Sequence, residues 1–334
     1  MSKNEFQDVK QIVKKAVEYK NDGDFNQAEE ALQKGLDKYS ENNYLKASLA
    51  DLFYRQKKLD KALNLADEIL SEKAGDTRAL TIKGNVHFAK REYKKAKEFF
   101  KEAYLNEKGE YTASRLIKVL NRLEEYERAL ELANKWREEA DNSNYFKKIA
   151  ANIYEKTGEN KKAEELFSEY LKEEPEDQFA YKEKIKVKLE NKTPQKAVEE
   201  LKNILSIAKR DKNPHLHSLL AEKLEKIGKS EEAVKEYEKT LELDPDNQFA
   251  LKQAGFALYK LKKYEKALPY LKEVFRNDPG DYYTRSVLMN IFKELNNEKE
   301  GIEFFKEIIE NNSGFENLWG MVKKLSKRLG DTNE

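Results

Sequence analysis

Few side chains in this sequence are suited to catalysis or metal binding, since its 334 residues include three histidines and no cysteine. His87 falls where the surrounding apolar pattern calls for a large packed side chain, so we interpret it as a core residue. His215 and His217 are two positions apart, which turns them about 200° from each other around a helix. They therefore cannot ligate one metal from one helix face. Without cysteine, disulfides and thiol-based metal centres are excluded as well, and the sequence predicts no metal site.

The usual catalytic and nucleotide-binding motifs are also missing. No GxGxxG, GxxxxGKS/T, GxSxG or HExxH occurs in the sequence. The 63 Asp and Glu residues offer many carboxylate pairs, but they stand among 64 Lys and Arg residues. On a surface so rich in charge, carboxylates more often solvate a helix face than act as an acid–base pair. We therefore expect no catalytic residues, no cofactor and no enzymatic activity.

The composition instead indicates a helical fold with a large water-exposed surface. Charged residues make up 38% of the chain against about 25% in an average globular protein, and there are only 13 glycines and 6 prolines. That scarcity of turn residues argues against β-sandwiches, barrels and Rossmann-type domains, whereas 18 Tyr and 16 Phe argue against disorder. A net charge of +1 gives no general preference for nucleic acid or membranes. No stretch resembles a signal peptide or a membrane span, so we expect a soluble, cytoplasmic protein.

A short phrase recurs along the chain, in which a charged pair precedes a small residue and apolar residues follow. The small residues are Ala28, Ala62, Ala96, Ala129, Ala163, Ala197, Ala233, Ala267 and Gly301. Successive members are 33 to 36 residues apart, and most are 34 apart. Because self-similarity at a fixed period is typical of stacked repeats, this pattern predicts a solenoid.

Each repeat reads as two amphipathic helices joined by a short turn. In the eighth repeat, apolar residues recur at the 3.6-residue spacing of a helix on both sides of Lys262. Gly158 and Gly228 lie at the equivalent turn of two other repeats, where a left-handed residue ends a helix at low cost. The chain then divides into a lead-in at residues 1–8, a solenoid of nine repeats at residues 9–315, and a capping helix with a tail at residues 316–334.

The repeats resemble the tetratricopeptide repeat (TPR), a family whose pattern places small residues at repeat positions 8, 20 and 27, large ones at 4, 11 and 24, and Pro at 32. The third repeat matches with Leu80, Gly84, His87, Ala96, Phe100 and Ala103, and the eighth with Leu251, Gly255, Leu258, Ala267, Leu271 and Pro279. Departures from the small residues are Ile117, Ile185 and Met289 at position 8 and Gly301 in place of Ala at position 20. The resemblance implies an all-α, right-handed α-solenoid of about nine helix–turn–helix repeats with a C-terminal capping helix.

The resemblance also implies which side chains line the concave groove, because repeat positions 2, 5, 9, 12 and 13 point into it in this family. At these positions fourteen residues are basic and six are acidic, so the groove carries about +8 on a chain of +1. Position 2 is aromatic in six of nine repeats, which fits either rings packed between repeats or rings partly exposed in the groove. We expect the binding residues to centre on repeats four to six: Tyr111, Lys118, Arg122, Tyr145, Lys148, Asn152, Lys156, Phe179, Lys182 and Lys186.

One well-known mode of recognition in the family is broken in this chain. The carboxylate clamp for acidic chaperone tails needs Lys and Asn four residues apart, as in Lys148 and Asn152, but Glu183 replaces the Asn of the next repeat. His215 and Leu219 replace the Lys and Arg required after it. We therefore predict a non-enzymatic scaffold or adaptor that binds an extended, acidic protein segment and supports complex assembly. The alternative is an RNA-binding helical repeat, and the sequence leaves the oligomeric state open.

Overall fold

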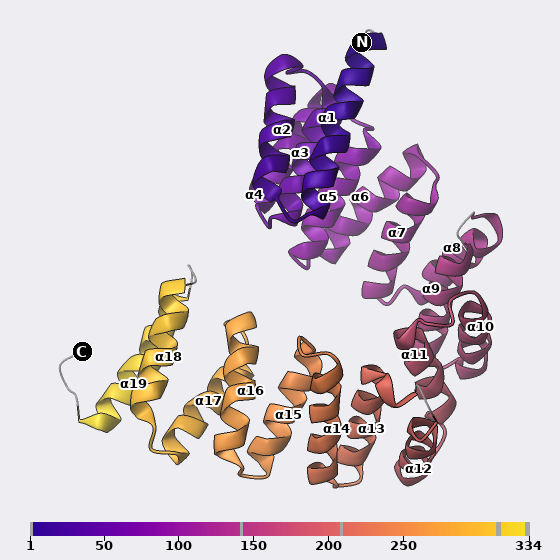
Figure 1. Ribbon diagram of the computed structural model, residues 1–334. Coiled ribbons are helices and arrows are strands. Elements are labelled where there is room, and N and C mark those ends of the chain that lie inside the picture. The colour runs from indigo at the N-terminus through magenta and orange to yellow at the C-terminus, as the bar shows by residue number, and fades with distance from the viewer. Residues whose placement is uncertain (1–2, 141–142, 208–209, 312–314, 331–334) are drawn as a thin grey trace. The chain divides into compact units, whose positions relative to one another are not determined.

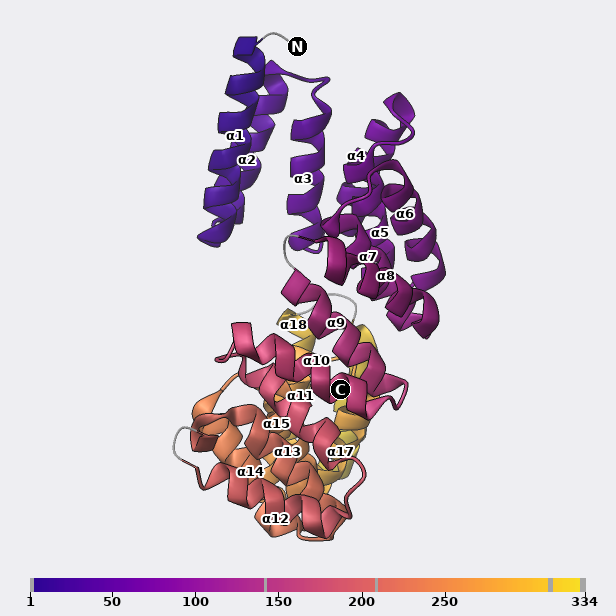
Figure 2. The same ribbon diagram turned by 90° about the vertical axis from the view of Figure 1, so that its right-hand side faces the viewer.

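The computed structural model describes residues 3–140, 143–207, 210–311 and 315–330, and in these ranges it holds nineteen α-helices, two short 3-10 helices and no strand. The chain is an all-α helical repeat solenoid, which confirms the predicted fold class. It divides into two units, Met1–Glu174 and Pro175–Glu334. Within each unit, most helices that follow one another pack side by side, as α1 and α2 do in Figures 1 and 2.

The helices of the N-terminal unit are α1 (Lys3–Asn21), α2 (Phe25–Lys38), α3 (Asn43–Arg55), α4 (Leu59–Glu72), α5 (Thr77–Ala89), α6 (Tyr93–Asn106), α7 (Glu110–Arg122), α8 (Tyr126–Glu139), α9 (Ser143–Lys156) and α10 (Asn160–Glu173). Those of the C-terminal unit are α11 (Gln178–Leu189), α12 (Pro194–Leu205), η1 (Arg210–Lys212), α13 (Pro214–Lys226), α14 (Ser230–Leu243), α15 (Gln248–Lys260), α16 (Tyr264–Asn277), α17 (Tyr282–Glu294), α18 (Glu298–Asn311), η2 (Glu316–Leu318) and α19 (Trp319–Leu329).

The first helix of most repeats begins after an Asn or Asp that caps it. The side chain of Asn42 accepts hydrogen bonds from the backbone N–H groups of Tyr44 and Leu45, both at 3.1 Å. Equivalent caps are Asp76, Asp177, Asn213, Asn247 and Asp281. Because these side chains satisfy N–H groups that a helix leaves unpaired, they fix where each first helix begins and which way its side chains point.

A residue with left-handed backbone follows the first helix of most repeats. Gly158 and Gly228 have φ of +79° and +78°, as predicted from the sequence. The same turn in other repeats is made by Gly23, Lys57, Arg91, Glu124, Lys262 and Asn296. A non-glycine residue is strained in this conformation because its Cβ crowds the backbone. Packing of the two helices therefore imposes the turn even where no glycine is present.

Small residues allow the two helices of a repeat to pack closely. The eight anchoring alanines are at most 1% exposed. A Cβ on Gly84 would lie 2.5 Å from the Phe100 ring, and one on Gly255 would lie 2.7 Å from Leu271. Position 8 of these repeats therefore needs glycine because the large residue at position 24 fills the space. The second helix α16 continues through Pro269 without ending there.

Helices α1 and α19 lie at the two ends of the described repeats. α1 begins at Lys3 and so includes most of the segment assigned to the lead-in, because Val9 continues the buried stripe of Val13 and Ala16. At the other end, Val322 of α19 is buried in the apolar core to which α18 contributes. Residues 331–334 of the predicted tail lie outside the described residues.

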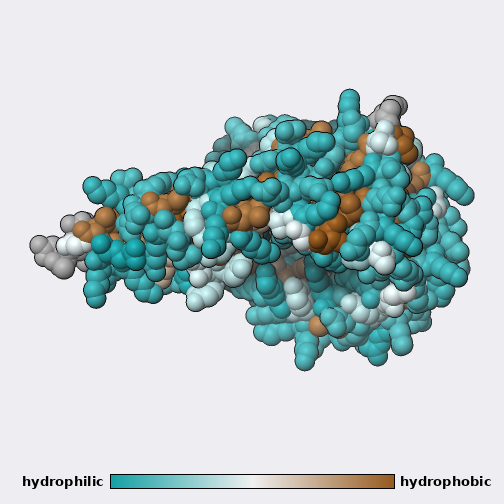
Figure 3. Space-filling view, turned by 90° about the horizontal axis from the view of Figure 1, so that it is seen from below, coloured by the Kyte–Doolittle hydropathy of each residue, from teal (hydrophilic) through white to brown (hydrophobic). Residues whose placement is uncertain are grey.

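The surface reflects the high share of charged residues. The face shown in Figure 3 is covered mainly by hydrophilic side chains, and its apolar residues form separate patches. None of the helices described here is long and apolar enough to cross a lipid bilayer.

Candidate functional site

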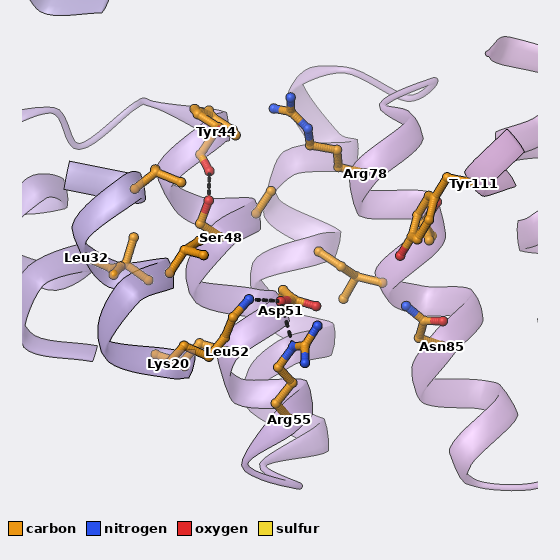
Figure 4. Close-up of a pocket in the computed structure, with 16 residues that line it drawn as sticks. Lys20, Leu32, Tyr44, Ser48, Asp51, Leu52, Arg55, Arg78, Asn85 and Tyr111 are labelled. Atoms are coloured by element: carbon orange, nitrogen blue, oxygen red, sulfur yellow. Dashed lines mark hydrogen bonds and ion pairs between the residues drawn. The ribbon is translucent and has the colours of Figure 1, made fainter. Parts of the chain in front are cut away.

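A pocket of about 320 Å³ lies on the first helices of repeats one to four, in the N-terminal unit. Its polar lining comprises Lys20, Tyr44, Ser48, Asp51, Arg55, Arg78, Thr81, Asn85 and Tyr111, and its apolar lining includes Val13, Val17, Leu52 and Ile82. These side chains come from α1, α3, α5 and α7 (Figure 4). Most of them stand at the repeat positions expected to face the groove, so the pocket belongs to that face of the unit.

The charged groups of this pocket form two distinct environments. The Asp51 carboxylate pairs with the Lys20 ammonium at 3.3 Å and with the Arg55 guanidinium at 3.1 Å. The Arg78 guanidinium instead lies over the Tyr44 ring, 4.2 Å from its centroid, and forms no ion pair with any described residue. Figure 4 shows Tyr44 and Arg78 apart from the Lys20–Asp51–Arg55 group. The Arg78 side of the pocket therefore offers a cation that the protein itself does not neutralise.

Among the uncharged polar groups of the pocket, Asn85 is distinctive. The Ser48 hydroxyl donates to the backbone oxygen of Tyr44 at 2.8 Å, and the Thr81 hydroxyl donates to its own helix in the same way. Asn85 is only 6% exposed, yet its side-chain amide makes no hydrogen bond with a described residue. Because Asn85 lines the pocket, its amide can donate to and accept from a bound group.

The predicted site residues of α7 lie at and beside this pocket. Tyr111 lines the pocket, is 54% exposed, and has the Arg115 guanidinium 4.9 Å from its ring centroid. The Lys118 ammonium lies 4.9 Å from the centroid of Phe88 on α5. Burial lowers the pKa of Lys118, and the positive charges of Arg115 and Arg122 lower it further. A nearby anion would therefore stabilise the charged form of this lysine.

The predicted site residues of α9 are partly engaged within the unit. The Asn152 amide donates to the backbone oxygen of Lys148 at 2.8 Å, one turn earlier in its own helix. The Lys156 ammonium donates to the side-chain oxygen of Asn121 at 2.9 Å. The Lys148 ammonium lies 5.3 Å from the centroid of the Tyr170 ring. Asn152 is thus not directed at an approaching backbone in this conformation.

The remaining predicted residues, on α11, belong to the C-terminal unit. The Lys182 and Lys186 ammonium groups pair with opposite oxygens of Glu183, at 2.6 and 3.4 Å. Glu183 is only 5% exposed, so both lysines compensate a buried carboxylate. The count of groove charges from repeat positions omits Glu183 and therefore overstates the free positive charge on α11.

The aromatic residues at position 2 combine both arrangements considered above. Tyr111, Tyr145, Phe179, Phe249 and Tyr283 are between 43% and 58% exposed. Three of the rings also contact a ring of an adjacent helix: Phe179 meets His215 at 5.5 Å, Phe249 meets Tyr237 at 6.4 Å, and Tyr283 meets Phe256 at 4.9 Å, centroid to centroid. Each of these three rings therefore packs on one side and leaves the rest of its surface accessible.

The uncharged residues that line the pocket were not predicted as site residues from the sequence. Asn85 stands at position 9 of the third repeat, and Val13 and Val17 stand at positions 5 and 9 of the first. These positions carry neither a cation nor a ring, so their residue types did not indicate a binding site even though their repeat register could be read from the sequence. In the described residues, no three His, Cys, Asp or Glu side chains are grouped so that they could hold a metal.

A family model and a solved structure with a TM-score above 0.5 agree with this architecture. A family model described as tetratricopeptide repeat matches residues 2–254. The crystal structure of a tetratricopeptide repeat protein from Parabacteroides merdae ATCC 43184 is 17% identical, covers 75% of this chain and 99% of its own, and has a TM-score of 0.58. A chain of the APC/C hetero-tetramer Cut9–Hcn1 is 12% identical over 84% of this chain and 55% of its own, with a TM-score of 0.49. No curated protein matches the sequence.

Proposed function

Because the chain belongs to the tetratricopeptide repeat family, we propose that it binds an extended, acidic segment of a partner protein along the first helices of its repeats and so supports complex assembly. Members of this family are protein-interaction scaffolds and are generally non-catalytic. The observation that carries the proposal is the pocket of the N-terminal unit. There Arg78, which pairs with no carboxylate of the described residues, the Asn85 amide and apolar side chains line one space. A chain without cysteine suits a reducing compartment, and we place this function in the cytoplasm.

Each part of the pocket suits a different group of such a segment. The Arg78 guanidinium can hold a carboxylate through two parallel hydrogen bonds. The Asn85 amide can donate to and accept from a peptide group, which matches an extended backbone. Val13 and Val17 offer apolar surface to a side chain between the acidic ones. The pocket thus favours an acidic segment with interspersed apolar residues over a purely acidic one.

The proposed contact extends from the pocket along α7 and α9, over Tyr111, Lys118, Arg122, Tyr145 and Lys148. Taken by itself, the C-terminal unit offers the exposed ring of Phe179, whereas Lys182 and Lys186 offer less free charge because they already neutralise Glu183. Exposed ion pairs contribute about 0.2–1 kcal/mol each, so the charges alone give weak and salt-sensitive binding. With apolar contacts added, we expect dissociation constants on the order of micromolar.

The test uses the full chain and a fluorescein-labelled twelve-residue peptide in which Asp or Glu alternates with Leu or Phe. We expect fluorescence anisotropy to show binding that weakens with salt, and a matched peptide with Lys in place of the acids to bind far less. The variant Arg78→Gln should weaken binding about threefold, the equivalent of roughly 0.7 kcal/mol. Lys101→Gln is the control, because Lys101 is an exposed cation of α6 outside the pocket.

The alternative of RNA binding is tested in the same assay. Cations interleaved with aromatic rings also suit single-stranded nucleic acid, on which bases stack. A labelled oligouridine serves as the probe. If the chain binds oligouridine tightly and neither peptide, the proposal of a protein partner is wrong. If it binds the acidic peptide equally well with Arg78 replaced, the pocket is not the site.

A further inference from the structure

A second pocket, of about 470 Å³, lies in the C-terminal unit, and the final helix α19 helps to line it. Tyr259 of α15, Arg285 and Lys293 of α17, and Met321 and Lys324 of α19 all face this space. α17 and α19 are near the carboxyl end of the chain in Figure 1. α19 therefore contributes side chains to this pocket as well as to the apolar core.

The repeat register explains how α19 reaches this pocket. Lys324 follows Asn290 by 34 residues, and Asn290 follows Phe256 by 34, so the period of the repeats continues into α19. α19 therefore takes the place of the first helix of a tenth repeat. Its residues Val322 and Leu325 enter the core, whereas Met321 and Lys324 line the pocket.

The pocket is positively charged, and no carboxylate of the described residues neutralises it. Its lining includes three cations, Arg285, Lys293 and Lys324, and no carboxylate. None of these three forms an ion pair with a described residue, in contrast to Lys252 of α15, which pairs with Asp281 at 2.5 Å. A bound anion would supply the counter-ion that these three cations lack among the described residues.

The same pocket presents aromatic and thioether surface. Tyr282 is 72% exposed and Tyr283 is 58% exposed, and the Arg285 guanidinium lies 5.0 Å from the Tyr282 centroid. The Asn290 amide donates to the Tyr259 hydroxyl at 2.8 Å and so holds that ring in place. Exposed tyrosine faces beside Met321 suit an aromatic or large apolar side chain.

We propose that α19 completes a second docking site, which binds an acidic protein segment with one aromatic or large apolar side chain flanked by carboxylates. The carboxylates pair with Arg285 and Lys324, and the apolar side chain lies between the tyrosine rings and Met321. This inference rests on the proposed function for its class of partner, a protein segment. The inference goes beyond the proposed function because it gives the capping helix a role in binding and places a second site in the C-terminal unit.

The experiment measures anisotropy of a labelled nine-residue peptide with a central Phe flanked by four Asp or Glu residues, in the presence of the full chain. We expect Arg285→Gln with Lys324→Gln to weaken binding of this peptide about five- to tenfold. Lys323→Gln should change it less than twofold, because Lys323 is exposed on the same helix but does not line the pocket. Circular dichroism of each variant checks that α19 remains folded.

The outcomes separate this inference from the proposed function. If the peptide binds and the double variant binds it as tightly as the parent chain, the second site does not exist. If Arg78→Gln weakens that binding in the same experiment, the proposed function stands without the second site. The inference would also be wrong if the parent chain did not bind the peptide. It would be wrong as well if the double variant lost binding to oligouridine but kept its binding to the peptide. If the peptide bound more tightly with Ser in place of its central Phe, the proposed contact of an aromatic side chain with the tyrosine rings and Met321 would be excluded.

Discussion

At the scale of single residues, Glu222 of α13 illustrates how burial sets the charge of a groove position. It stands at position 9 of the seventh repeat and is partly buried. Burial raises its pKa above 4.5, although Lys182, Lys186 and Lys223 act in the opposite direction. Because the folded-state pKa exceeds the unfolded one, the charged carboxylate destabilises the fold at neutral pH, and this cost disappears when both states are protonated.

We therefore expect Glu222→Gln to raise the free energy of unfolding near pH 7. The gain should shrink as the pH falls through the folded-state pKa and vanish below about pH 4. Urea unfolding at several pH values measures this, with Glu199→Gln, an exposed position on α12, as the control. A gain that does not change with pH would show that the charge of Glu222 is not its cause.

The left-handed turn residues allow a second prediction at this scale. Lys262 has φ of +57° and forms no ion pair with a described residue, so glycine should relieve its strain. We expect Lys262→Gly to raise the free energy of unfolding by about 0.5–1 kcal/mol after the added entropy of the unfolded chain is subtracted. Lys262→Ala is the matched control, since it removes the same side chain but keeps the Cβ. Equal stability of the two variants in urea unfolding would contradict the strain.

Individual contacts were the least predictable part of the candidate site. Repeat register gave Tyr111 a place on the face of the first helices, where it lines the pocket, because register follows from helix period alone. It did not reveal that Glu183 binds Lys182 and Lys186, since ion pairing depends on side-chain rotamers and burial. The unpaired amide of Asn85 was equally hidden, because a sequence does not show which polar groups lack partners.

At the scale of elements, the packing of α19 against the last repeat explains a departure from the family pattern. A Cβ on Gly301 of α18 would lie 2.8 Å from Leu325 and 2.9 Å from Phe292. We expect Gly301→Ala to lower the free energy of unfolding by about 1–3 kcal/mol through overpacking, despite the better helix propensity of alanine. Gly320→Ala on α19 is the control: nothing lies within 4 Å of its Cβ, so it should be neutral or stabilising by up to about 1 kcal/mol.

Element order and pairing were largely predictable, since the 34-residue period and the apolar stripes determine them. The caps at Asn42 and Asp281 strengthen boundaries that periodicity places only roughly. The division of the chain into two units after Glu174 was not predictable, because the repeat spacing from Ala163 to Ala197 is the regular 34. That division depends on how many contacts join neighbouring helices, which composition does not report.

At the scale of the whole molecule, a solenoid is stabilised by contacts between neighbouring repeats. A terminal repeat has a neighbour on one side only, so its apolar face needs another element to cover it. In the C-terminal unit Phe304, Phe305 and Ile308 of α18 are at most 2% exposed and share an apolar core with Leu318, Val322 and Leu325. Arg328 of α19 adds an ion pair to Glu298 at 2.8 Å. Removal of α19 would leave these three α18 side chains without their cover.

We therefore expect deletion of residues 316–334 to lower the stability of the C-terminal unit and to promote self-association. The deletion exposes an apolar patch, and two molecules can bury such patches against each other. Sedimentation velocity at several protein concentrations should show larger species for the truncated chain than for the parent chain. Deletion of residues 331–334 alone is the control, since it keeps α19 whole. If both truncated chains sediment like the parent and unfold at the same urea concentration, α19 does not protect the core. The continued 34-residue register at Lys324 would then serve the second pocket alone, and the loss of peptide binding without a change in association would show this directly.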